Sequence, residues 1–259
     1  MDLRARTDEC LILRGRDYNE TDRLLIVFSR SFGKMSCLAK GVRRNNSRLK
    51  ASTQLFSYSR LTFAPSKGLA VITQGEAIDA QAGLREDLTK IACAAYIGEL
   101  LDAALPEEKP QDGLFVLGVS ALTLLCSLDE PFLLLRYFEL RLLAELGYRL
   151  NFGECGYCGR SATVPRLSAC AERGGLLCDS CRSRMSAAYG QALKLPTVSG
   201  GTCRLLDGLL NWDLRRIFTL KVTPAMQQEV DAACADYLAY FLGRPAEKAR
   251  ENLRLYYKV

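Results

Sequence analysis

Two pairs of closely spaced cysteines constrain what this chain can fold into more than any other feature. Cys155 and Cys158 are separated by two residues; after nineteen intervening residues, Cys178 and Cys181 repeat that spacing. A turn of this length directs two sulfurs at one ion, and two such turns supply the four ligands that tetrahedral Zn²⁺ prefers. Because four cysteines leave no coordination position for water or substrate, the spacing predicts a structural zinc site.

Two other interpretations of these cysteines stay open. A Cys-x-x-Cys pair serves as a redox dithiol in some proteins, and buried cysteines also occur simply as small apolar side chains. Cys170 lies between the two pairs. Its neighbours Ala169 and Ala171 do not form a turn of the required kind, so we leave it out of the ligand set.

The chain contains no histidine, the commonest general base and metal ligand of proteins. This absence excludes Ser-His-Asp and Cys-His arrangements, the zinc deaminase signature and the His-Glu-x-x-His protease. A Gly-x4-Gly-Lys-Ser/Thr phosphate-binding loop is absent as well. Acidic pairs such as Glu86-Asp87 and Glu107-Glu108 look like surface charge at helix ends. We therefore expect a protein that is not an enzyme, with a magnesium-dependent nuclease as the alternative.

Charge is distributed unevenly along the chain. Residues 1–85 contain 15 Lys and Arg against 8 Asp and Glu, residues 86–150 contain 5 against 11, and residues 151–259 contain 15 against 10. A basic part suits a polyanionic partner, whereas the acidic middle part suits protein partners better. The N-terminus lacks the apolar core of a secretory signal, and no apolar run reaches the roughly 18 residues that span a bilayer. We expect a cytoplasmic protein with no membrane partner.

The first 80 residues show the alternating pattern and the short turns that are typical of a small β-barrel. Gly33 lies in a turn between two expected strands, where a positive φ angle is often needed. Five strands and one longer loop fit an OB-fold, and an SH3-like barrel fits the count almost as well. The expected strands are Glu9–Arg16, Asp22–Ser29, Met35–Ala39, Thr53–Phe63 and Leu69–Thr73.

Apolar residues then recur at helical spacing. Asp112 is placed to cap one helix, Pro131 to lie in the first turn of the next, and Gly147 to end it. The sequence predicts an α+β multidomain protein with an N-terminal five-stranded OB-like β-barrel, then an α-helical domain with an inserted four-cysteine zinc module. The predicted boundaries are 1–80 for the barrel, 81–152 and 186–259 for the two parts of the helical domain, and 153–185 for the zinc module. The expected helices are 85–105, 112–128, 132–146, 201–211 and 224–242, with a last short helix at 250–259.

The stretch from Arg30 to Lys50 contains seven basic residues and no acidic residue. Its densest part links two expected strands and is too polar for a core, so its cations can neutralise phosphates; a merely solvated loop is the alternative. The candidate nucleic-acid contacts are Lys34, Lys40, Arg43, Arg44, Arg48 and Lys50. Aromatic residues of the barrel are candidates for stacking on bases, although core packing is the commoner role for each of them: Phe28, Phe32, Phe56, Tyr58 and Phe63.

Several longer blocks of the sequence carry a family resemblance. They are Tyr18-Asn19-Glu20-Thr21-Asp22-Arg23-Leu24-Leu25-Ile26-Val27-Phe28-Ser29, Gly33-Lys34, Ala39-Lys40-Gly41-Val42-Arg43-Arg44, Ser47-Arg48-Leu49, Gln54-Leu55-Phe56 and Arg136-Tyr137-Phe138-Glu139-Leu140-Arg141-Leu142-Leu143-Ala144-Glu145-Leu146-Gly147-Tyr148, followed by the paired cysteines. Through these blocks nearly the whole chain resembles the RecO family of bacterial DNA repair proteins.

The resemblance implies an N-terminal OB-fold, a helical domain and a zinc-binding module. It also implies a nucleoid-associated recombination mediator that binds single- and double-stranded DNA and anneals complementary strands. With RecR, such a protein helps to load the RecA recombinase onto strands covered by single-strand-binding protein. The family pattern carries DNA contacts over to four positions of this chain: Lys40, Arg43, Arg44 and Arg48.

Annealing of this kind is passive, because basic surfaces lower the repulsion between two polyanions without bond chemistry. The basic residues 151–259 are a candidate surface for a second strand. A zinc-containing, redox-responsive nucleic-acid-binding protein is the alternative to a recombination mediator.

Overall fold

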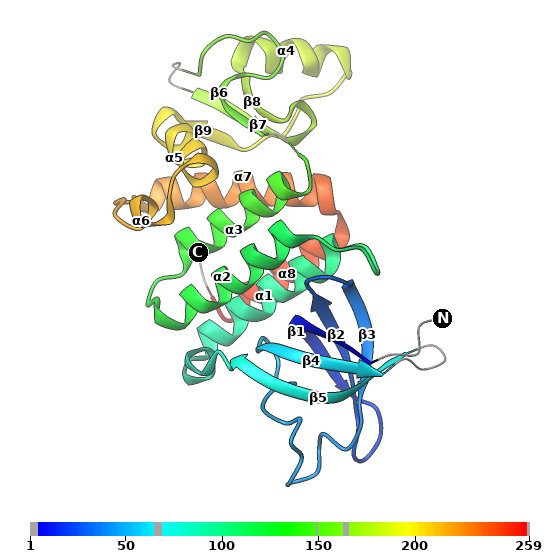
Figure 1. Cartoon of the computed structure of the whole chain (residues 1–259). Coiled ribbons are helices and arrows are strands. Elements are labelled where there is room, and N and C mark those ends of the chain that lie inside the picture. The colour runs from blue at the N-terminus through cyan, green and yellow to red at the C-terminus, as the bar shows by residue number, and fades with distance from the viewer. Residues whose placement is uncertain (1–4, 65–68, 149, 163–165, 258–259) are drawn as a thin grey trace. The chain divides into compact units, whose positions relative to one another are not determined.

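The N-terminal strands close into a five-stranded barrel (Figure 1) in the order β1-β2-β3-β5-β4. The computed structural model describes residues 5–64, 69–148, 150–162 and 166–257. Neighbouring strands are antiparallel except for β3 and β5, which run parallel. The predicted OB-like barrel is confirmed. Its strands are β1 (Arg6–Asp17), β2 (Arg23–Ser29), β3 (Gly33–Ala39), β4 (Tyr58–Ala64) and β5 (Ala70–Asp79).

Alternate residues of β4 are buried in the barrel, as their pattern predicts, whereas β1 has four consecutive buried residues, 10–13. On β4, Leu61 and Phe63 are buried, whereas Arg60 beside them is exposed. Gly33 opens β3 with a φ of +78°, which agrees with the positive φ expected at this turn. The barrel core consists of Cys10, Ile12, Leu25, Val27, Cys37, Ala39, Val42, Leu61, Phe63 and Ile72.

Most strand ends lie within three residues of the prediction, but the start of β4 and the end of β5 differ by more. The chain forms turns from Thr53 onward, where the fourth strand was expected to begin. The Thr53 backbone N–H and hydroxyl both donate to the carbonyl oxygen of Leu49, at 3.1 and 2.6 Å, and Phe56 has a φ of +67°. A chain that bonds to its own preceding carbonyl and contains a left-handed residue cannot continue as a strand. In contrast, β5 extends to Asp79, past its predicted end at Thr73.

Two helices pack against the barrel within the first compact unit, Met1–Asp129. Phe115 of α2 makes edge contacts with Phe28 and Tyr58 of the barrel, at 5.4 and 6.0 Å between ring centroids. The predicted helical part 81–152 is therefore divided between two compact units of the chain. The helical elements of the first unit are η1, a short 3-10 turn (Ala82–Glu86), α1 (Leu88–Ala104) and α2 (Asp112–Ser127).

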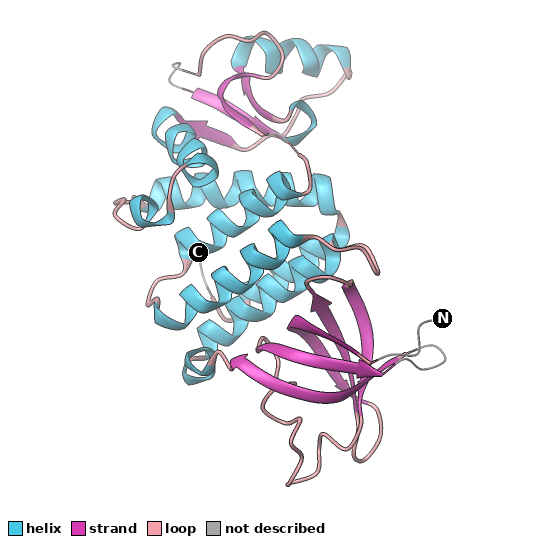
Figure 2. Cartoon of the chain, in the orientation of Figure 1, coloured by secondary structure: helices cyan, strands magenta, loops and turns pink. Residues whose placement is uncertain are grey.

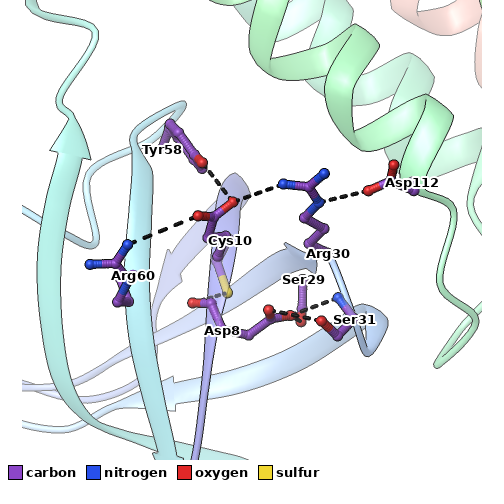
Figure 3. A network of polar contacts seen from close by, with 9 residues as sticks. Asp8, Cys10, Ser29, Arg30, Ser31, Tyr58, Arg60 and Asp112 are labelled. Atoms are coloured by element: carbon purple, nitrogen blue, oxygen red, sulfur yellow. Dashed lines mark hydrogen bonds and ion pairs between the residues drawn. The ribbon is translucent and has the colours of Figure 1, made fainter.

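Asp112 has a different role from the predicted helix cap. It is the first residue of α2, after Gln111 at the cap position, and its carboxylate accepts a hydrogen bond from Arg30 Nε at 2.6 Å. Arg30, labelled with Asp112 in Figure 3, also pairs with Glu9 at 3.2 Å, and Glu9 accepts from the Tyr58 hydroxyl at 2.7 Å. An acidic residue in the first turn still interacts favourably with the helix dipole. The network neutralises Arg30 and ties α2 to the barrel.

The second compact unit, Glu130–Val259, is built around α3. Gly147 ends this helix with a φ of +92°, as its position predicts. The helix expected at 224–242 matches α7 at both ends. The last helix lies earlier than the predicted 250–259, because the chain turns at Gly243 (φ +67°) and α8 starts directly after it. None of the helices in the described ranges is both long enough and apolar enough to cross a bilayer. The helices are α3 (Phe132–Glu145), α5 (Gly200–Asn211), α6 (Leu214–Ile217), α7 (Pro224–Leu242) and α8 (Arg244–Arg254).

A buried ion network joins three of these helices. The side chains of Arg136 and Glu139 on α3 are 1% and 0% exposed, and their charged groups lie 2.8 Å apart. Arg250 of α8 donates to Glu139 at 2.8 Å, and Asp231 of α7 accepts from both arginines. Charges buried this deeply are tolerated only when they are paired, so the network fixes α3 against α7 and α8.

A four-stranded sheet in the second unit carries the paired cysteines, with the strand order β6-β8-β7-β9. Figure 2 distinguishes these strands, in magenta, from the cyan helices of the same unit. Tyr237 of α7 donates its hydroxyl to the Gly175 carbonyl oxygen at 2.9 Å and packs on Phe152, so the sheet is anchored to α7. The sheet extends beyond the predicted module end at residue 185. Its elements are β6 (Asn151–Cys155), β7 (Arg166–Cys170), β8 (Gly175–Cys178), α4 (Asp179–Ala188) and β9 (Thr197–Ser199).

Candidate nucleic-acid interface and metal centre

The four predicted ligands come together where β6 and β8 end. Cys155 and Cys178 are the last residues of these strands, Cys158 lies in the turn after β6, and Cys181 lies in the first turn of α4. Their four sulfur atoms all lie within 4.8 Å of one another. Cys158 is exposed and the other three are buried. Cys170 is buried elsewhere in the sheet, outside this group.

Glycines and backbone N–H groups shape the turn that carries the first pair. Gly159 has a φ of +69°, and a Cβ atom at Gly156 would lie 2.3 Å from the Arg173 carbonyl oxygen. The backbone N–H of Cys178 donates to Cys155 Sγ at 3.4 Å. Hydrogen bonds of this kind stabilise a thiolate, and the glycines allow the close approach that they need.

The thiols of this group differ in pKa. Burial raises the pKa of Cys155, but backbone N–H groups, led by that of Cys178, donate to its sulfur and lower the pKa to about 6. At Cys181, burial and the neighbouring thiols raise the pKa to about 12. Sulfur atoms this close together cannot all be charged without a cation between them. The donor set therefore fits a closed metal centre that binds four thiolates.

The basic segment forms an ordered loop between β3 and β4, which we call the basic loop (residues 40–57). Its backbone folds into consecutive turns, in which Arg44 N–H donates to Gly41 O at 3.2 Å and Ser47 N–H donates to Arg44 O at 3.1 Å. Val42 is 5% exposed and belongs to the barrel core. The loop is therefore anchored to the barrel, while its charged side chains remain accessible to solvent.

The turn between β1 and β2 holds the start of the basic loop. The side-chain oxygen of Asn19 accepts from the backbone N–H groups of Thr21 and Asp22, at 2.9 and 2.7 Å. Asp22 in turn accepts from the Gly41 N–H at 2.7 Å, and this bond, together with one from Asn19, lowers the pKa of the Asp22 carboxyl. Arg43 N–H donates to Thr21 O at 3.0 Å. The Asn-x-Thr-Asp turn therefore shapes the loop, a role that was not predicted although such turns are recognisable in a sequence.

Four cations of the basic loop, which we call the loop cations, are exposed and form no ion pair with any residue in the described ranges. Arg43 differs from them, because its guanidinium donates to Asn19 O at 2.8 Å and pairs with Asp17 at 3.2 Å. The loop thus presents positive charge that is not held in ion pairs, although Lys40 interacts at longer range with the Asp22 carboxylate and helps to lower its pKa. The loop cations are Lys40, Arg44, Arg48 and Lys50.

Lys34 lies apart from the other predicted contacts. Its side chain is 12% exposed, and its Nζ donates to the Asp102 carbonyl oxygen at 2.8 Å. The same nitrogen pairs with the carboxylates of Asp102 and Glu107, at 3.3 and 3.4 Å. The charge of Lys34 is therefore already balanced within the first unit, where it joins β3 to the last turn of α1 and to the segment after it.

We expect Lys34→Ala to lower the free energy of unfolding by about 1–2 kcal/mol, because it removes a largely buried cation from Asp102. The effect stays moderate since Arg14 also pairs with Asp102, at 2.9 Å. Lys40→Ala is the matched control and should leave stability nearly unchanged, because Lys40 is exposed. Urea unfolding measures both. A Lys34→Ala protein with wild-type stability and weakened DNA binding would contradict this structural role.

Most of the candidate stacking residues pack inside the first unit. Phe28, Phe56 and Phe63 are 0%, 8% and 4% exposed, which is the commoner role expected for such residues. Phe32 and Tyr58 are half-buried. The basic loop is therefore more accessible to a polyanion than these rings are.

Two family models match the sequence. The model described as recombination protein O N terminal matches residues 1–81, and the one described as recombination protein O C terminal matches residues 85–251. Three similar relatives are each named DNA repair protein RecO. The relative from Desulforamulus reducens is 31% identical, over 96% of this chain and 94% of its own length. Those from Symbiobacterium thermophilum and Pelotomaculum thermopropionicum are 32% and 34% identical, over 93% and 91% of this chain and 93% and 89% of their own lengths.

Proposed function

Because this chain belongs to the RecO family and so has a DNA repair and recombination function, we propose that it binds single- and double-stranded DNA through the basic loop. The observation that carries the proposal is the set of loop cations on a backbone anchored to an OB-like barrel. Each Lys or Arg that meets a phosphate releases condensed counterions. Affinity from this source is strong, depends on salt and is nearly independent of DNA sequence.

The same proposal includes strand annealing and recombinase loading. The protein brings complementary strands together and, with RecR, helps to load RecA onto DNA covered by single-strand-binding protein, as the family resemblance implies. Annealing here needs no bond chemistry and no enzyme activity, because the loop cations lower the repulsion between two polyanions. Exposed acidic residues such as Glu107 and Glu108 repel DNA, so the segment after α1 suits a protein partner better.

We propose Zn²⁺ as the metal held by the four cysteines. Four sulfur ligands within 4.8 Å of one another favour this ion, and four cysteines fill its coordination sphere. The residues of this chain would hold the ion in a structural role. Its contribution is to keep the ends of β6 and β8 and the start of α4 together.

Annealing of complementary oligonucleotides, one carrying a fluorophore and the other a quencher, tests the proposed function. We expect annealing without ATP, and both binding and annealing should weaken steeply as salt rises. A parallel reaction with Mg²⁺, analysed on a denaturing gel, should leave the strands intact. Failure to anneal at every salt concentration, or cleavage that follows the purified protein, would contradict the proposal.

A further inference from the structure

Two arginines approach an exposed aromatic ring at the first cysteine pair. Tyr157 stands between Cys155 and Cys158 in sequence, and it is 44% exposed. The guanidinium carbons of Arg173 and Arg184 each lie 5.3 Å from the centroid of its ring. We propose that this group is a second DNA contact, at which an unpaired base stacks and the arginines meet the flanking phosphates. The inference rests on the proposed DNA function and assigns a site that is separate from the basic loop.

The three side chains come from three different elements. Tyr157 lies in the turn after β6, Arg173 ends the short 3-10 turn η2 (Ala171–Arg173), and Arg184 lies on α4. Cys158 and Cys181 link the turn after β6 to α4 through the metal centre. Assembly of the four-cysteine centre therefore also brings Tyr157 near Arg184.

The chemistry of the site matches single-stranded DNA. Bases stack on exposed aromatic rings and on guanidinium planes, and the phosphates between them pair with arginine. Arg184 is exposed and has no ion pair among the residues that the structure describes. Arg173 pairs with Glu172 at 3.6 Å, but both side chains are more than one-third exposed, so a phosphate can compete for this arginine. Because the bases of a duplex are already stacked on one another, the ring should select single strands.

A purely structural role for the same arginines gives a different expectation. A zinc ion with four thiolates carries a charge of −2, and arginines nearby would offset it. That role depends on the arginine charges and does not need an exposed ring at position 157. Replacement of Tyr157 therefore separates the two roles.

Titration of a single-stranded oligo-dT and of a duplex of equal length, at one salt concentration, tests the site with metal-loaded protein. Tyr157→Ala should weaken single-strand binding about 5- to 10-fold, since stacking on an aromatic residue contributes this much or more. Duplex binding should not change. Tyr157→Phe should keep the wild-type affinity, because the ring remains. Tyr256→Ala removes the ring of another exposed residue, since Tyr256 is 63% exposed, and it should not change the affinity for either DNA.

The result that overturns the inference is metal-loaded Tyr157→Ala that binds the single strand like the wild type. If this variant loses its metal, photo-crosslinking of the wild-type protein to an oligonucleotide with 5-iodouracil decides the question. A cross-link at Tyr157 supports the site, and cross-links confined to the first unit overturn it. A different result would contradict the proposed function: replacement of the loop cations would leave the affinities for single-stranded and duplex DNA unchanged.

Discussion

A protein without the loop cations should bind single-stranded DNA several hundred-fold more weakly at 0.1 M salt. Log affinity falls with log salt, and for single strands each phosphate contact makes this slope steeper by about 0.7. The loss of four contacts should therefore make the slope shallower by about 3. At 0.1 M salt this corresponds to a loss of nearly three orders of magnitude in affinity. The variant replaces four residues by glutamine: Lys40, Arg44, Arg48 and Lys50.

Duplex binding should weaken in the same variant, because the loop contacts phosphates rather than bases. The slope of log duplex affinity against log salt should become shallower by about 0.9 for each lost contact. Stability should change little, since the replaced side chains are exposed and the turns of the loop are held by backbone hydrogen bonds. Equal slopes in this variant and in a charge-matched control would show that general charge, rather than the basic loop, binds DNA. The control replaces by glutamine four exposed cations of the second unit: Arg204, Arg215, Lys221 and Lys248.

Structure that depends on residues near one another in the sequence is predictable for this chain. The spacing of Cys155 and Cys158 is a local property of one turn, and the two pairs form the predicted group. The helix at 224–242 has both of its ends at the expected residues, because Pro224 follows a capping Thr223 and Gly243 stops it. The alternation in β4 likewise predicts that Leu61 and Phe63 are buried.

The sequence does not show which cations of the basic segment are paired within the fold and which are accessible, because the partners of the paired ones lie far away in the sequence. Arg30 and Lys34 belong to the same charge run as the loop cations. In the structure Arg30 pairs with Asp112, 82 residues away, and Lys34 pairs with Asp102, 68 residues away. Only the packing of α1 and α2 on the barrel brings these carboxylates near. Position in the fold, rather than charge density, therefore distinguishes the accessible cations from the neutralised ones.

The aromatic site at Tyr157 was missed for a related reason. Its two arginines are sixteen and twenty-seven residues further along the chain, and they approach the ring only when the sheet and α4 have formed. The predicted stacking residues all lie in the barrel, because OB-folds commonly bind oligonucleotides there. In this chain the three most buried of them, Phe28, Phe56 and Phe63, pack inside the first unit instead.

Replacement of Cys178 by serine should remove the bound metal and unfold the sheet around it. Serine supplies a neutral oxygen in place of a thiolate, so three sulfurs would remain for an ion that requires four ligands. Structural zinc contributes about 10–16 kcal/mol to the folding of isolated zinc-finger peptides. Here the bond from Tyr237 to Gly175 also holds the sheet, so we expect local unfolding of residues 151–199 with the helices retained. Metal analysis and hydrogen exchange measure the two effects.

Cys170→Ala is the matched control, because Cys170 is buried in the same sheet but lies outside the four-cysteine group. It should keep its metal and lose only about 1 kcal/mol of stability from the smaller side chain. Equal metal loss in both variants, or full metal content in Cys178→Ser, would contradict the four-thiolate centre. Because the basic loop belongs to the other compact unit, Cys178→Ser should still bind duplex DNA. Its binding of single strands should fall to the level of Tyr157→Ala, since the metal centre brings Tyr157 near Arg184.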